Sequence, residues 1–92
     1  MRLLITTSFV KATKKLHAPQ KVELDAALKL ISKDPIMGEA KVGDLVGVYV
    51  YKFRLCQQQV LLAYRIVDPE SIKLLTFGSH ENFYRDLKRQ AK

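Results

Sequence analysis

The sequence predicts an α+β domain, because helical and strand patterns occupy separate stretches of its 92 residues. Apolar residues recur at helical spacing over residues 8–33, and they alternate at strand spacing over residues 47–77. A chain of this length has room for one hydrophobic core, so we expect residues 1–92 to form a single domain. The expected order is an N-terminal strand, an antiparallel helical hairpin, a three-stranded antiparallel meander and a C-terminal helix.

The N-terminal third is expected to contain the strand and the two helices. Residues 2–6 favour a short strand, and Ser8 is a suitable N-cap for a helix that ends near Leu16. Pro19 suits the first turn of a second helix, which continues to about Lys33. The second helix has the apolar spacing of an amphipathic helix, at Leu24, Ala27, Leu28 and Ile31.

The pattern changes after a loop at residues 34–46, which is rich in proline and glycine. Alternation predicts strands over residues 47–55, 60–67 and 72–77, with a polar turn at Gln57, Gln58 and Gln59. Ser79 is a natural N-cap for the last helix, about residues 80–90. We expect the helices to cover the more apolar sheet face, which leaves the other face to carry Lys52, Arg54 and Arg65.

Charge gives the first functional indication. Sixteen Lys and Arg residues face nine Asp and Glu residues, for a net charge of +7. This excess predicts an anionic partner, although a basic surface kept for solubility is the alternative. The single cysteine, Cys56, and the short apolar run at the N-terminus predict a cytoplasmic protein with no membrane partner. The sequence has no cysteine, histidine or carboxylate set typical of a metal site, so we expect no metal or cofactor.

A candidate active site follows from two groups of residues. Lys52 and Arg54 are two apart on a strand and share a face, and Arg65 has the parity to join them from the next strand. Such cations bind phosphate oxygens through charge-assisted hydrogen bonds, but they could also be solvated surface residues. His80 stands at the start of the last helix, where positive charge favours the neutral imidazole of a general base. Tyr84 is four residues on and shares its helical face, although both could be structural.

These residue types suit RNA cleavage without metal. RNA carries its own nucleophile, the 2′-hydroxyl group, so the protein needs to supply only a base, an acid and cations that stabilise the transition state. The sequence offers candidates for each of these roles.

Several strings, taken in order, resemble the RelE/ParE superfamily of bacterial toxins. They span nearly the whole chain: Ser8–Lys11, Asp34–Gly38, Tyr51–Arg54, Leu62–Asp68 and Gly78–Tyr84. The resemblance implies a RelE-like fold and a toxin of a type II toxin–antitoxin module, held inactive by a cognate antitoxin. In the RelE-like branch it implies metal-independent cleavage of mRNA in the ribosomal A site.

The resemblance also assigns residues. Lys52 and Arg54 match the basic pair on the RelE strand, and His80 with Tyr84 resembles the Gly-x-His-x-x-x-aromatic ending of the YafQ-like branch. Two positions depart from the pattern. Leu61 aligns with a strand arginine of RelE, and Thr76 stands where YafQ-like toxins carry a basic residue.

Three functions are therefore open. The first is a ribosome-dependent mRNA endonuclease, in which ribosomal RNA would also contact Arg85, Lys88, Arg89, Lys11, Lys14 and Lys15. The second is a ParE-like inhibitor of DNA gyrase with no nuclease activity. The third is a non-toxic basic RNA-binding module, which the loss of the strand arginine at Leu61 would favour.

Overall fold

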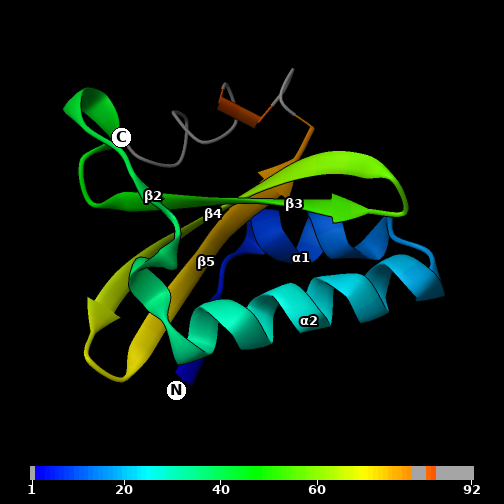
Figure 1. Cartoon of the computed structure of the whole chain (residues 1–92), viewed down its shortest axis with the longest axis horizontal. Coiled ribbons are helices and arrows are strands. Elements are labelled where there is room, and N and C mark those ends of the chain that lie inside the picture. Colours follow the sequence, from blue (N-terminus) through cyan, green and yellow to red (C-terminus); the bar gives the residue numbers. More distant parts are fainter. Residues whose placement is uncertain (1, 80–82, 85–92) are drawn as a thin grey trace.

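The computed structural model describes residues 2–79, 83 and 84, and it confirms the α+β fold class. In the described part of the chain the sheet has five strands, and Figure 1 shows the helices on one side of it. In chain order the elements are β1 (Arg2–Ile5), α1 (Thr7–Lys14), α2 (Ala18–Lys33), the 3₁₀ turn η1 (Pro35–Met37), β2 (Glu39–Ala40), the 3₁₀ turn η2 (Gly43–Leu45), β3 (Val48–Leu55), β4 (Gln58–Asp68) and β5 (Ser71–Gly78).

The sheet has the strand order β1-β5-β4-β3-β2. The predicted meander is present, because β3, β4 and β5 pair antiparallel. The N-terminal strand β1 pairs parallel with β5. The prediction of a loop over residues 34–46 was incomplete, because β2 lies within it and pairs with β3. A two-residue strand is too short to show alternation in the sequence, so only its tertiary pairing reveals it.

The first helix is capped by Thr6, not by Ser8 as the sequence suggested. The Thr6 side chain accepts a hydrogen bond from the Phe9 N–H group (3.2 Å) and donates one to the Leu75 carbonyl oxygen (2.6 Å). The first bond satisfies an N–H group in the first turn of the helix, and the second attaches the start of the helix to β5. The hydroxyl of Ser8, inside the helix, instead approaches that of Thr76 at 3.4 Å.

The hairpin between β3 and β4 turns at Cys56 and Gln57, one residue earlier than the predicted polar turn. Both residues have positive φ angles, 48° and 73°, as a two-residue type I′ turn requires. A carboxylate oxygen of Glu23 on α2 accepts a hydrogen bond from the Cys56 N–H group at 2.6 Å. The helix thus holds the turn although neither turn residue is glycine or asparagine.

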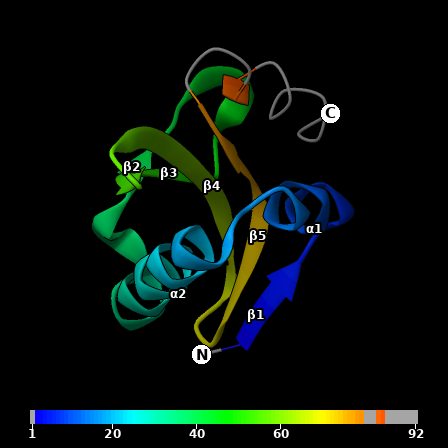
Figure 2. The ribbon, with the colours of Figure 1, turned by 90° about the vertical axis from the view of Figure 1, so that its right-hand side faces the viewer.

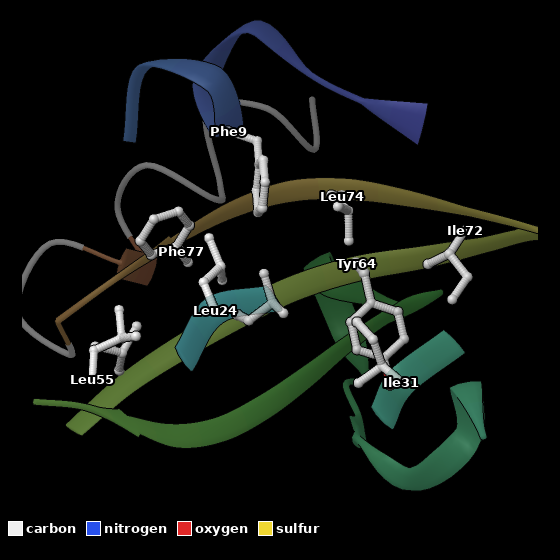
Figure 3. Close-up of a cluster of buried hydrophobic side chains, with 10 residues drawn as sticks. Phe9, Leu24, Ile31, Leu55, Tyr64, Ile72, Leu74 and Phe77 are labelled. Carbon is white, nitrogen blue, oxygen red and sulfur yellow. The ribbon is translucent and has the colours of Figure 1, made fainter. Parts of the chain in front are cut away.

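Figure 2 shows α1 and α2 on the same face of the sheet, and Figure 3 shows the side chains of the main core between these helices and the strands. The rings of Phe9 on α1 and Phe77 on β5 meet edge to face, with centroids 5.3 Å apart. Leu24 and Ile31 bring α2 onto β3 and β4, as their helical spacing predicted. The tyrosines and phenylalanine of β3 pack on this cluster, so they belong to the core and form no exposed platform.

A second apolar cluster covers the opposite face of the sheet, which we call the second face. It contains Leu45, Val48, Val50, Leu61, Ala63, Leu75 and Phe83. We expected this face to be an uncovered basic surface, and that expectation was wrong for its centre. Phe83 belongs to this cluster and Tyr84 packs against it, so both lie on the side of the sheet opposite the main core and the helices. Cations on this face are therefore confined to its margins.

Tyr64 connects the main core to the start of β2. Its side chain is fully buried, and its hydroxyl group donates to the Pro35 carbonyl oxygen at 2.6 Å. The Gly38 N–H group donates to the same hydroxyl at 3.2 Å. A Cβ atom at Gly38 would lie 2.6 Å from this oxygen, so glycine is needed at this close approach. Tyr64 thereby sets the position of Glu39 and the residues after it.

Tyr64→Phe is expected to destabilise the protein by about 1–3 kcal/mol, because it leaves the Pro35 carbonyl and the Gly38 N–H without their partner. Burial raises the pKa of Tyr64 above its ordinary value of 10.0. The folded state holds the phenolic proton more tightly, so its contribution is present below pH 10 and falls as the pH rises through the raised pKa. Urea titrations between pH 8 and pH 11 should show a loss of stability that the variant lacks.

Tyr51→Phe is the matched control for this prediction. The half-buried ring of Tyr51 stacks on Phe53, with centroids 5.7 Å apart. Equal losses in the two variants, or an alkaline loss that persists without the Tyr64 hydroxyl, would contradict the anchoring role.

Candidate nucleic-acid interface

Lys52 and Arg54 lie on the exposed end of β3, near the hairpin. Both side chains are exposed, and strand alternation places them on the second face with Val48 and Val50. Their partners across the ladder are Leu61 and Gln59, neither of which is charged. Two neighbouring cations without an opposing charge across the strand form a surface suited to phosphate.

Arg65 does not join this pair, contrary to the sequence-based expectation. It lies opposite Val48, whereas Lys52 lies opposite Leu61, four residues away along β4. At strand spacing this separates Arg65 from Lys52 by roughly 13 Å. Its guanidinium group is directed instead toward the η2 loop, where Nη1 donates to the Val46 carbonyl oxygen at 3.4 Å. Strand alternation correctly predicted the sheet face of Arg65, but the register of β4 against β3 could not be predicted from the sequence.

Glu39 on the edge strand β2 and Lys41 just after it lie beside Val50 and Val48 of β3, and sequence reasoning missed both. Glu39 lies opposite Val50, so it is the diagonal neighbour of Lys52. The Lys41 N–H group donates to the Val48 carbonyl oxygen at 2.9 Å, which continues the pairing past the end of β2. The Lys41 ammonium bonds the Glu39 carboxylate at 2.8 Å. The signal available was a Glu-x-Lys alternation inside the predicted loop.

Tyr84 meets this group from the C-terminal side. Its partly buried ring packs on the second cluster and contacts Phe83 edge to face, with centroids 5.0 Å apart. The Lys41 ammonium lies 5.4 Å from the Tyr84 ring centroid, within the range of a cation–π contact. The predicted site residues Tyr84 and Lys52 are thus on the same face. His80, Arg85, Lys88 and Arg89 lie outside the described residues, as does most of the predicted last helix.

The ionisation of this group follows from these contacts. The hydrogen bond to Lys41 lowers the pKa of Glu39, and the charges of Lys41 and Lys52 act in the same direction. The bond to Glu39 raises the pKa of Lys41, and a hydrogen bond with Tyr84 adds to this effect. Both Glu39 and Lys41 are therefore charged at neutral pH.

The two positions that depart from the family pattern are both buried. Leu61 is 2% exposed within the second cluster, and Thr76 is 4% exposed. Apolar packing thus occupies the part of the second face where the resemblance would place an arginine. Cations that contact a ligand on this face must come from its margin, where Lys41, Lys52 and Arg54 lie.

The predicted ribosome-binding lysines of α1 lie on the helix side of the sheet. Lys11 and Lys15 line an open groove of about 460 Å³ whose floor includes Leu55, Val60 and Phe77 of the main core. Lys14 is exposed and is not part of this groove. The α1 lysines and the Lys52–Arg54 pair therefore belong to different surfaces.

No group of three or more histidine, cysteine, aspartate or glutamate side chains suited to a metal ion occurs within residues 2–79, 83 and 84. In the same part of the chain, no helix is long and apolar enough to cross a membrane.

The family model described as the ParE-like toxin of type II bacterial toxin–antitoxin systems matches residues 3–88. The chain belongs to this family, which confirms the resemblance to the RelE/ParE superfamily. A comparison with curated proteins gives no match.

Solved structures share the fold at low sequence identity. The E. coli toxin RelE in the intact RelBE toxin–antitoxin complex is 20% identical, with a TM-score of 0.71 over 87% of this chain and 96% of that one. A double arginine-to-alanine mutant of RelE in the free state is also 20% identical, with a TM-score of 0.73 over 96% and 95%. A conserved hypothetical protein from Helicobacter pylori is 17% identical, with a TM-score of 0.59 over 90% and 98%.

Proposed function

We propose that this toxin is a ribosome-dependent endonuclease that cleaves mRNA without a metal ion. The observation that carries the proposal is the placement of Lys52 and Arg54 on the same sheet face as Tyr84, with Lys41 in contact with the Tyr84 ring. Cations and an aromatic ring on one surface suit a phosphate and its neighbouring base. The likeness in fold to E. coli RelE agrees with this proposal.

The proposed reaction uses the 2′-hydroxyl group of the RNA. Its oxygen forms a bond to the adjacent phosphorus as the bond from phosphorus to the 5′-oxygen breaks. A base accepts the 2′-hydroxyl proton, and an acid supplies a proton to the leaving 5′-oxygen. Lys52 and Arg54 would stabilise the additional negative charge on the phosphate in the transition state. Arg65 is left out of this role, because its guanidinium group is directed toward the Val46 carbonyl oxygen and away from Lys52.

The proton-transfer roles are assigned to His80 and Tyr84. His80 would be the general base or acid, because imidazole changes its protonation near neutral pH. Tyr84 would stack on a base or assist the proton transfer. Arg85, Lys88 and Arg89, together with the α1 lysines, would contact ribosomal RNA.

A cognate antitoxin is the proposed protein partner. The E. coli RelBE structure, which contains a chain similar in fold to this one, is a toxin–antitoxin complex. The net charge of +7 favours a partner with acidic segments, since charge complementarity accelerates encounter and selects the partner.

Inhibition of DNA gyrase is a second candidate function. It is favoured by the family model, which describes a ParE-like toxin, and by the buried Leu61, which stands on the second face where the nuclease pattern has an arginine. This function needs a docking surface and no proton transfer.

Expression of the full chain without an antitoxin distinguishes the two functions. We expect translation to stop and transcripts to be cut within translated regions. His80→Ala should abolish this toxicity, because the base or acid is lost. A DNA damage response with intact transcripts, or full growth arrest by His80→Ala, would contradict the nuclease proposal. The first of these results would support gyrase inhibition.

A further inference from the structure

We propose that Lys41 is a third phosphate-binding cation of the interface, and that the Glu39 carboxylate occupies it when no RNA is bound. This inference rests on the proposed function, because it assumes that the margin of the second face receives RNA. The Glu39 carboxylate would compete with RNA phosphate for Lys41. Removal of the Glu39 charge is therefore expected to strengthen RNA binding.

Lys41 is held in place by its contacts with Tyr84 and β3. Its side chain is only 22% exposed, and its ammonium lies against the Tyr84 ring at 5.4 Å. The backbone of Lys41 is fixed to β3 through the Val48 carbonyl oxygen. Lys41 is therefore held at the margin of the second face, on the same side of the sheet as Lys52 and Arg54.

Glu39 lies close to both Lys41 and Lys52. Its side chain is 64% exposed, and one oxygen bonds the Lys41 ammonium at 2.8 Å. Glu39 is also the diagonal neighbour of Lys52, whose charge lowers the pKa of the Glu39 carboxyl. A carboxylate between two cations takes the place that a phosphate oxygen would take.

Exchange of the carboxylate for phosphate is chemically reasonable. The Glu39 carboxylate of this ion pair faces water, where solvent and salt weaken the attraction between the two charges. An RNA strand whose phosphates contact Lys52 and Arg54 would gain one further contact, between a phosphate oxygen and Lys41, by displacing Glu39. The anchor from Tyr64 to Gly38 keeps the start of β2 in place during this exchange. Glu39 thus lowers affinity for RNA phosphates until a correctly placed one competes.

The test uses the free full-length chain and a single-stranded RNA with 2′-O-methyl groups throughout, which cannot be cleaved through the 2′-oxygen. Fluorescence anisotropy gives the Kd at several salt concentrations. Glu39→Gln is expected to tighten binding about 3- to 10-fold, the factor that corresponds to one phosphate contact of modest strength. Lys41→Ala is expected to weaken binding by a similar factor, and Lys41→Arg should retain most of the affinity.

Asp25→Asn is the matched control, because it makes the same change in net charge on the exposed surface of α2. Equal tightening by Asp25→Asn and Glu39→Gln would overturn the proposal in favour of a general charge effect. Unchanged RNA affinity in Glu39→Gln would also overturn the proposal. So would a Glu39→Gln effect of the same size in a chain that already carries Lys41→Ala. Thermal melts by circular dichroism check that each variant is folded.

Lys52→Ala/Arg54→Ala distinguishes this inference from the function on which it rests. Weaker RNA binding by that variant, with no response to Glu39 or Lys41, would reject the Lys41 site and leave the proposed function standing. An affinity that no substitution in this group alters would count against both.

Discussion

Joint replacement of Lys52 and Arg54 by alanine is expected to lower the rate of mRNA cleavage on the ribosome by at least about 100-fold. Loss of one donor that stabilises a transition-state charge typically costs about 100- to 1,000-fold in rate. Both side chains are exposed, and neither forms an ion pair among the described residues, so the fold should tolerate their loss. Single-turnover cleavage of a defined ribosome-bound mRNA measures the rate.

The matched control is the pair Lys21→Ala and Lys29→Ala. These exposed lysines lie on α2, on the opposite side of the sheet, and their removal lowers the net charge by the same amount. The control should lose only the part of the affinity that reflects long-range attraction. A control variant as slow as the Lys52/Arg54 variant would contradict a local role for the pair.

Phe83→Ala is expected to have the largest effect on stability, about 3–5 kcal/mol. Phe83 is 1% exposed and fills the centre of the second cluster, where Leu45, Leu61 and Leu75 also pack. A domain of this size is stable by only about 5–14 kcal/mol, so the loss is a large part of the total. Urea denaturation of the purified chain measures it.

The milder pair Phe83→Leu and Phe77→Leu separates stability from function. Phe77 belongs to the main core on the helix side, whereas Phe83 contacts Tyr84 on the second face. Both variants should lose some stability, but only Phe83→Leu should weaken RNA binding, because the Tyr84 ring loses its support. Equal RNA affinity in the two variants would show that Tyr84 is not part of the interface.

Sequence periodicity was enough to predict the fold class and most elements. Leu24 and Ile31 have helical spacing and bury against the sheet, and Val48, Val50 and Lys52 share a face as alternation requires. These patterns work because each periodicity belongs to one kind of backbone. The cap at Thr6 and the turn at Cys56 were each misplaced by one or two residues, because tertiary partners, Leu75 and Glu23, fix them.

The candidate site was predictable only in part. The pairing of Lys52 with Arg54 follows from their separation of two residues along a strand. The distance of Arg65 depends on strand register, which the cross-strand ladder sets and local sequence does not. Lys41 and Glu39 acquire their role through β2, which exists only as a partner of β3. The apolar cover of the second face likewise depends on Leu45 and Phe83, which come from distant segments.

The most direct test of the central claim is to map the ends of an mRNA cut by the purified chain on programmed ribosomes. The account predicts a 2′,3′-cyclic phosphate on the upstream fragment and a 5′-hydroxyl on the downstream one. It also predicts that a single 2′-deoxynucleotide at the cleaved position blocks the cut. An mRNA that stays intact, or a cut that continues at the 2′-deoxy position, would contradict it.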